Sequence, residues 1–138
     1  MTVEELFERY VDQAYPSKEK AIESLTTKKR MRIYHGVDPT APQLHFGHAT
    51  NYLLLRGLQE LGHKITLLIG DFTAQIGDPT GKSASRPPLT KKRVLQNSRT
   101  YQKQAGKILD FTSKKNPVTI QFNSAWLAKM SFEDVVRL

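Results

Sequence analysis

A strand–helix–strand pattern in the first half of the chain constrains the fold more than any other feature. Met31 to Tyr34 and Lys64 to Ile69 are short, mostly apolar runs, and Gly36 ends the first of them. Between them, apolar residues recur at helical spacing from Tyr52 to Leu61, and Gly62 follows where a left-handed C-terminal residue belongs. A span of about forty residues is the length of a right-handed βαβ crossover, so the pattern predicts two parallel strands in one sheet.

The flanking segments extend this alternation. Thr2 and Glu5 form a capping-box pattern that predicts a first helix, Pro16 ends it, and Ser17 can cap a second. Farther on, we expect a long basic helix from Thr90 through Leu109, a third strand over 117–122, and short helices opened by Ser124 and Ser131. Residues 70–88, which contain glycines and prolines, are expected to be a loop. The chain is therefore predicted to be one α/β domain over 1–138, with a helical leader at 1–30 and a parallel, Rossmann-like sheet over 31–138.

Composition narrows the chemistry. The chain has no cysteine, which excludes disulfides, thiolate metal sites and a cysteine nucleophile. Its N-terminus has no signal-peptide pattern and no apolar run is long enough to span a membrane, so we expect a soluble, cytoplasmic protein without a membrane partner. The net charge of +8 is concentrated in 82–115, which holds ten Lys or Arg and one acid. Such a segment either attracts phosphates or is a solvated helix face.

The sharpest chemical motif is His45-Phe46-Gly47-His48, at the predicted start of the central helix. Two imidazoles three residues apart lie on one helical face, beside unpaired backbone N–H groups and the positive end of the helix dipole. They can donate hydrogen bonds to a polyphosphate, while a glycine between them lets a flat purine approach the backbone. A pair of surface histidines around a helix-start glycine is the alternative interpretation of these four residues.

The surrounding motifs resemble a known family. The run from Tyr34 to His48 resembles the HIGH signature of class I aminoacyl-tRNA synthetases with its lead-in, in the form typical of tyrosyl enzymes, with Phe46 in place of Ile. The segment 77–82, Gly-Asp-Pro-Thr-Gly-Lys, resembles the loop that separates the tyrosyl from the tryptophanyl branch. The resemblance covers essentially the whole chain and implies the N-terminal part of a bacterial-type tyrosyl-tRNA synthetase catalytic domain, with a HUP-type nucleotide-binding fold preceded by two helices.

The resemblance implies a role for each matching residue. Tyr34 would hydrogen-bond the hydroxyl of the substrate tyrosine, so that phenylalanine leaves a buried polar group unpaired. Asp78 would receive the α-ammonium group, with Thr73 on the same pocket wall. The remaining roles are ATP binding by Gly36, Asp38, Gly47 and Asn51, and catalysis by Thr40, His45 and His48. The alternative interpretations are an ordinary core tyrosine for Tyr34 and an Asp-Pro turn for Asp78.

The implied reaction is attack of the tyrosine carboxylate on the α-phosphorus of ATP, followed by transfer of the tyrosyl group to tRNA(Tyr). We expect Mg²⁺ to arrive on the nucleotide, with no protein-bound metal. Gly77 to Ser83 is not a P-loop, since three rather than four residues separate its glycines. Lys129-Met130-Ser131 resembles half of the KMSKS loop, the second class I signature, but lacks its second lysine.

The KMSKS loop, the dimer-forming insertion of a usually homodimeric family and the anticodon-binding domain are all absent from the sequence. We therefore expect a piece of a longer protein, with weak substrate binding or slow adenylate formation. Three alternatives stay open at this point. They are an ATP- and tyrosine-binding fold fragment without turnover, a basic RNA-binding module that uses Lys91 to Lys115, and another nucleotidyl transferase.

Overall fold

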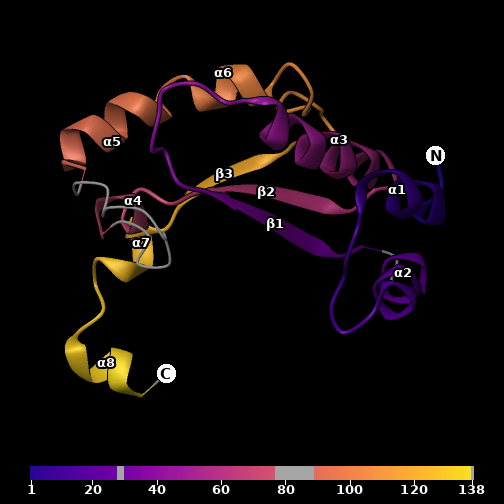
Figure 1. Ribbon diagram of the computed structural model, residues 1–138, viewed down its shortest axis with the longest axis horizontal. Coiled ribbons are helices and arrows are strands. Elements are labelled where there is room, and N and C mark those ends of the chain that lie inside the picture. Colours follow the sequence, from indigo (N-terminus) through magenta and orange to yellow (C-terminus); the bar gives the residue numbers. More distant parts are fainter. Residues whose placement is uncertain (28–29, 77–88, 138) are drawn as a thin grey trace.

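Three parallel strands form the centre of the computed structural model, which describes residues 1–27, 30–76 and 89–137 (Figure 1). The strands are β1 (Arg32–Val37), β2 (Lys64–Ile69) and β3 (Thr119–Phe122), and they lie in the order β1-β2-β3. Tyr34 pairs with Thr66, which pairs in turn with Thr119. The predicted parallel α/β sheet is confirmed.

The helices are those the sequence predicts, with two corrections. They are α1 (Val3–Tyr10), α2 (Lys18–Thr27), α3 (Phe46–Glu60), α4 (Thr73–Ile76), α5 (Lys91–Ser98), α6 (Tyr101–Ala105), α7 (Ser124–Leu127) and α8 (Phe132–Val136). The long basic helix expected over 90–109 is wrong, because it divides into α5 and α6. Helix α4 lies within the segment expected to be a loop.

Side chains of both α5 and α6 reach the loop after β1. Asn97 donates to the carbonyl of Pro39 at 2.9 Å, and the Tyr101 hydroxyl donates to the carbonyl of Ala41 at 2.7 Å. Thr100 and Gln104 both donate to the carbonyl of Pro42 at 2.9 Å. These bonds satisfy backbone acceptors in a loop whose two prolines prevent regular pairing.

One face of the sheet holds the hydrophobic core. Helices α1, α3 and α6 lie on this side in Figure 1. Leu6, Tyr52, Ile65, Leu67 and Leu109 are each at most 2% exposed there. Gly57 allows the close approach of α1 to α3, because a Cβ at this position would overlap the side chain of Leu6. The opposite face carries Tyr34, which is 73% exposed, and is open among the described residues.

None of the helices in the described ranges combines the length and apolar character needed to cross a membrane.

Candidate nucleotide and amino-acid site

The two histidines of the motif form the N-terminal cap of α3. The His45 ring accepts a hydrogen bond from the backbone N–H of Gly47 through Nδ1 at 3.2 Å. The His48 ring accepts one from the backbone N–H of His45, also through Nδ1 and at 3.2 Å. Their ring centroids are 4.0 Å apart. Because each Nδ1 is an acceptor, the proton of each neutral ring lies on Nε2, which leaves two N–H donors at a helix start.

The protonation state of His48 follows from its surroundings. Partial burial, and secondarily the neighbouring charge of His45, hold the pKa of His48 below its usual range. Behind it, the Tyr52 ring lies 6.5 Å from the His48 ring and 5.7 Å from that of His35 on β1. His35 also has a lowered pKa, mainly through burial. A neutral His48 is thus the stable form at neutral pH, and it acts as a hydrogen-bond donor rather than as a cation.

Gly47 has a steric reason to be glycine. A Cβ at this position would lie 3.1 Å from Cε1 of the His45 ring. A side chain here would therefore push the ring away from the backbone N–H that it accepts from. The same bare backbone is the surface against which the sequence places a purine.

A polar network joins the carboxyl ends of the three strands. The Thr73 hydroxyl, at the start of α4, donates to Oδ1 of Asp38 at 2.7 Å, and Nδ2 of Asn123 donates to the Thr73 oxygen at 3.0 Å. Gly70 follows β2 directly, and a Cβ there would overlap the Asp38 carboxylate. In parallel α/β sheets, ligands bind at this edge. Asp38 and Thr73, predicted for the ATP and the tyrosine side respectively, are therefore in direct contact at this edge.

Asn123 was not among the predicted site residues, although it is central to this network. It is 7% exposed, and its Oδ1 accepts from the backbone N–H of Phe72 at 2.9 Å. Asp71 makes a similar link, accepting from the Ser124 backbone at 2.9 Å and from its hydroxyl at 2.6 Å. A polar residue that directly follows a predicted parallel strand is the signal that could have identified Asn123.

The other predicted residues occupy separate parts of the site. Tyr34 lines a pocket of about 370 Å³ on the open sheet face, with Leu68, Gln121 and Trp126 among its neighbours. His45 lines a different pocket, of about 470 Å³, between α3 and α6. The described residues therefore do not place Tyr34 and the histidines in one cavity.

The remaining predicted residues lie near the ends of β1 and α3. Gly36 lies near the end of β1, with open space where a Cβ would project. Thr40 and Asn51 are exposed, in the loop after β1 and on α3 respectively. Asp78 lies outside the described residues, as does the rest of the predicted GDPTGK loop.

No group of three or more His, Asp or Glu side chains that could hold a metal ion occurs within 1–27, 30–76 and 89–137.

A parallel sheet with a polar carboxyl edge, next to a helix start that presents two imidazole N–H donors, is typical of nucleotide-binding α/β proteins. Residues 26–138 match the family described as tRNA synthetases class I (W and Y), and the chain belongs to this family.

Relatives with curated names agree with this assignment. The chain is 48% identical to Tyrosine--tRNA ligase 2 of Vibrio parahaemolyticus over 130 residues, which are 94% of this chain and 32% of the relative. It is also 48% identical to the tyrosine--tRNA ligase of Thermotoga maritima over 122 residues, which are 88% of this chain and 29% of the relative. The chain thus spans about a third of the length of these relatives.

Solved structures show the same fold. A C-terminally truncated mitochondrial tyrosyl-tRNA synthetase of Aspergillus nidulans superposes with a TM-score of 0.80 at 28% identity, covering 99% of this chain and 41% of that one. The tyrosyl-tRNA synthetase of Archaeoglobus fulgidus, solved with L-tyrosine, superposes with a TM-score of 0.71 at 20% identity. It covers 97% of this chain and 38% of that one.

Proposed function

We propose that the chain supplies the ATP- and tyrosine-binding part of a tyrosine–tRNA ligase, which activates L-tyrosine to tyrosyl-adenylate for transfer to tRNA(Tyr). The observation that carries the proposal is the pair of Nδ1-capped histidines at the start of α3, within 4.0 Å of one another. The tyrosine--tRNA ligases to which the chain is 48% identical support the choice of amino acid. So does the Archaeoglobus fulgidus structure, which contains L-tyrosine.

In this proposal, catalysis is positioning and electrostatic stabilisation. The Nε2–H groups of His45 and His48, together with the Thr40 hydroxyl, would donate to phosphate oxygens as negative charge develops on them. Neutral donors suit this role because they stabilise the developing charge without a proton having to be lost. ATP would bring its Mg²⁺ with it.

The amino-acid pocket would use the opposite side of the sheet edge. Tyr34 would contact the substrate hydroxyl, while Thr73 and Asp78 would form the wall near its α-ammonium group. The hydrogen bond that the Thr73 hydroxyl donates to the Asp38 carboxylate connects this pocket wall to the loop expected to contact ATP. Gly36 and Asn51 would contribute to the nucleotide side.

Pyrophosphate exchange dependent on tyrosine tests the proposal. We expect slow exchange by the purified chain and loss of that exchange in the double variant His45→Ala, His48→Ala. Lys20→Ala, a change at an exposed position on α2, is the control and should match the unmodified chain. Equal rates in the double variant and the unmodified chain would remove the catalytic role of the histidines.

Binding without turnover is the second candidate function, because Tyr34 and His45 line separate pockets. Calorimetric titration with a non-hydrolysable tyrosyl-adenylate analogue distinguishes the two. Heat of binding without any exchange would select this second function, whereas the absence of both would overturn the proposal.

A further inference from the structure

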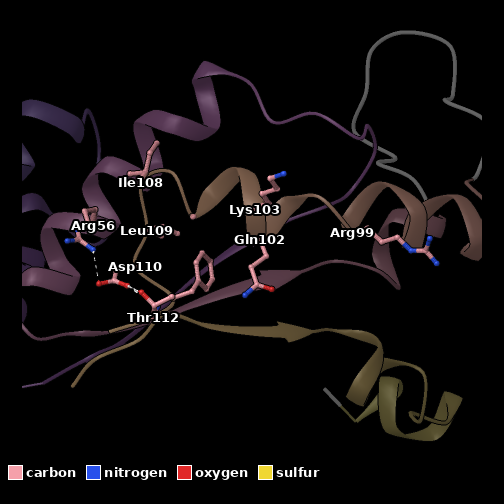
Figure 2. A pocket seen from close by; sticks show the side chains of 10 residues that line it. Arg56, Arg99, Gln102, Lys103, Ile108, Leu109, Asp110 and Thr112 are labelled. Atoms are coloured by element: carbon pink, nitrogen blue, oxygen red, sulfur yellow. Dashed lines mark hydrogen bonds and ion pairs between the residues drawn. The ribbon is translucent and has the colours of Figure 1, made fainter. Parts of the chain in front are cut away.

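A pocket beside α6 is lined by none of the residues predicted for the candidate site. It has a volume of about 780 Å³ and lies between Arg56 of α3 and the segment from Arg99 to Thr112. Figure 2 shows Arg56, Asp110 and Thr112 gathered at one end, with Gln102, Lys103 and Arg99 following one another toward the other end. The pocket is therefore an elongated groove, here called the α6 groove.

The charges at the two ends of the α6 groove differ. At the first end, Arg56 contacts Glu60 at 2.8 Å and Asp110 at 3.7 Å. Asp110 also accepts from the backbone N–H of Thr112 at 2.8 Å, and its hydrogen bonds with Thr112, above all that one, lower the pKa of its carboxyl. This end is thus balanced by charges that the protein itself supplies.

The second end is cationic. Arg99 and Lys103 are four residues apart across the α5–α6 junction and both are exposed. Neither forms an ion pair with any acid in the part of the chain that the structure describes. Further exposed cations precede and follow these two in the sequence, namely Lys91, Lys92, Arg93, Lys107, Lys114 and Lys115. This end attracts a ligand with several negative charges along its length.

Between the two ends the α6 groove offers surfaces suited to a planar polar ring. Ile108 and Phe111 are half-buried, and both line the groove. Gln102 adds a carboxamide that can both donate and accept hydrogen bonds. Gly106 keeps the groove open next to Phe111, whose ring edge would lie 3.6 Å from a Cβ at that position. An unpaired nucleobase needs an aromatic or apolar surface for stacking and a polar group for its edge.

We propose that the α6 groove binds an unpaired nucleotide of an RNA strand, with the base against Phe111 and Gln102 and the flanking phosphates on Arg99 and Lys103. The proposed function supplies the reason to expect RNA as the polyanion. The α6 groove shares Ile108 with the pocket that His45 lines, but neither the histidines nor Tyr34 line the groove. It is therefore an additional RNA contact, separate from the site of adenylate formation.

Fluorescence anisotropy with a labelled single-stranded RNA of roughly 12 nucleotides tests this inference in the absence of ATP and tyrosine. The double variant Arg99→Ala, Lys103→Ala should raise Kd by about tenfold and reduce the slope of log K against log salt by about 1.4, the value for two phosphates of a single strand. Phe111→Leu should also raise Kd by about tenfold, through lost stacking. The matched control Lys20→Ala, Lys129→Ala removes two exposed cations elsewhere and should change Kd less than about twofold.

Two results would overturn the inference. One is equal weakening in the matched control, which would show a diffuse charge effect. The other is displacement of RNA by polyglutamate as effectively as by unlabelled RNA, which would show an acidic-protein surface. Since Arg99 and Lys103 are exposed, their variants should keep the far-ultraviolet circular dichroism of the unmodified chain even if Phe111→Leu does not fold. This test is independent of the test of the proposed function. Pyrophosphate exchange can be absent while RNA binding persists, and RNA binding can be absent while pyrophosphate exchange persists.

Discussion

At the scale of single residues, the histidine motif combines two roles that the sequence does not separate. Each ring is a hydrogen-bond acceptor toward the backbone through Nδ1 and a donor outward through Nε2. The sequence predicted the outward donors from spacing alone. It could not show that the same rings cap the helix, because Nδ1 capping depends on side-chain rotamers that spacing does not determine.

Variants of His45 can distinguish its role as the cap of α3 from its role as an outward hydrogen-bond donor. His45→Asn should keep the stability of the chain, because Asn is among the best N-cap residues, while removing the Nε2–H donor. His45→Ala should lose both the N-terminal cap and the Nε2–H donor, and the loss of the cap should lower the free energy of unfolding by about 1 kcal/mol. Urea denaturation measures the first effect and pyrophosphate exchange the second. Equal stabilities of the Asn and Ala variants would contradict the capping role.

Gly36 and Gly70, at the carboxyl ends of neighbouring strands, allow a comparison of the cost of adding a methyl group in open and in crowded space. Gly70→Ala should destabilise the chain by about 1–3 kcal/mol, because the new methyl group would overlap the Asp38 carboxylate and must displace it. Gly36→Ala is the matched control, since its Cβ would meet open space, and it should change stability by less than about 0.5 kcal/mol. Thermal unfolding followed by circular dichroism compares the two. Similar midpoints for both variants would argue against a tight contact at Gly70.

At the scale of elements, sequence periodicity was sufficient for the strands and for α3. Their apolar faces are set by burial, and burial against one sheet face is what periodicity records. The division into α5 and α6 was not predictable in this way. Around this break, Asn97, Thr100 and Tyr101 donate hydrogen bonds to carbonyls of a loop some sixty residues earlier. No pattern local to 90–109 contains that partner.

Gln59 shows how one side chain of α3 supports a distant segment. It is 6% exposed, and its Nε2 donates to the carbonyls of Asp110 and Asn116 at 2.7 and 2.8 Å. Its Oε1 accepts from the backbone N–H of Asp110 at 3.2 Å. Gln59→Leu would leave these backbone groups unpaired, so we expect a loss of about 2–3 kcal/mol in the free energy of unfolding.

Gln96→Leu, at an exposed position on α5, is the matched control for that change and should stay within about 0.5 kcal/mol of the unmodified chain. Urea denaturation of both variants gives the comparison. If the two substitutions cost the same, the hydrogen bonds of Gln59 contribute nothing beyond the change of side chain.

At the scale of the whole molecule, the sheet divides the candidate site. Alternation along β1 places His35 toward α3 and Tyr34 on the opposite, open face. The sequence predicted Tyr34 and the histidines of α3 around the substrates of one reaction, and the carboxyl edge with Asp38, Thr73 and Asn123 is where the two faces meet. The motifs in the sequence were enough to indicate the family. That Tyr34 lies on the opposite face of the sheet from α3 follows only from the alternation of side chains along β1.

The histidines also determine how the stability of the whole chain depends on pH. Burial is the main cause that lowers the pKa values of His35, His48 and His63 in the folded state. The unfolded chain therefore binds more protons than the folded chain once the pH falls below about 6.5. The stability that these groups contribute is fully present above that value. It is lost as the pH falls from about 6.5 through the folded-state pKa values.

We accordingly expect the urea midpoint to fall between about pH 7.5 and pH 5.5, because three imidazoles act in the same direction. Asp110 and Asp134 have pKa values lowered from 3.8, so their titration lies below this window and does not mask the effect. His48→Asn should reduce the pH dependence by the share of one imidazole while retaining a polar side chain near the helix start. A midpoint that stays constant or rises on acidification would mean that the three rings become protonated without cost in the folded state. In that case neutral Nε2–H donors could not be the species that faces the phosphates.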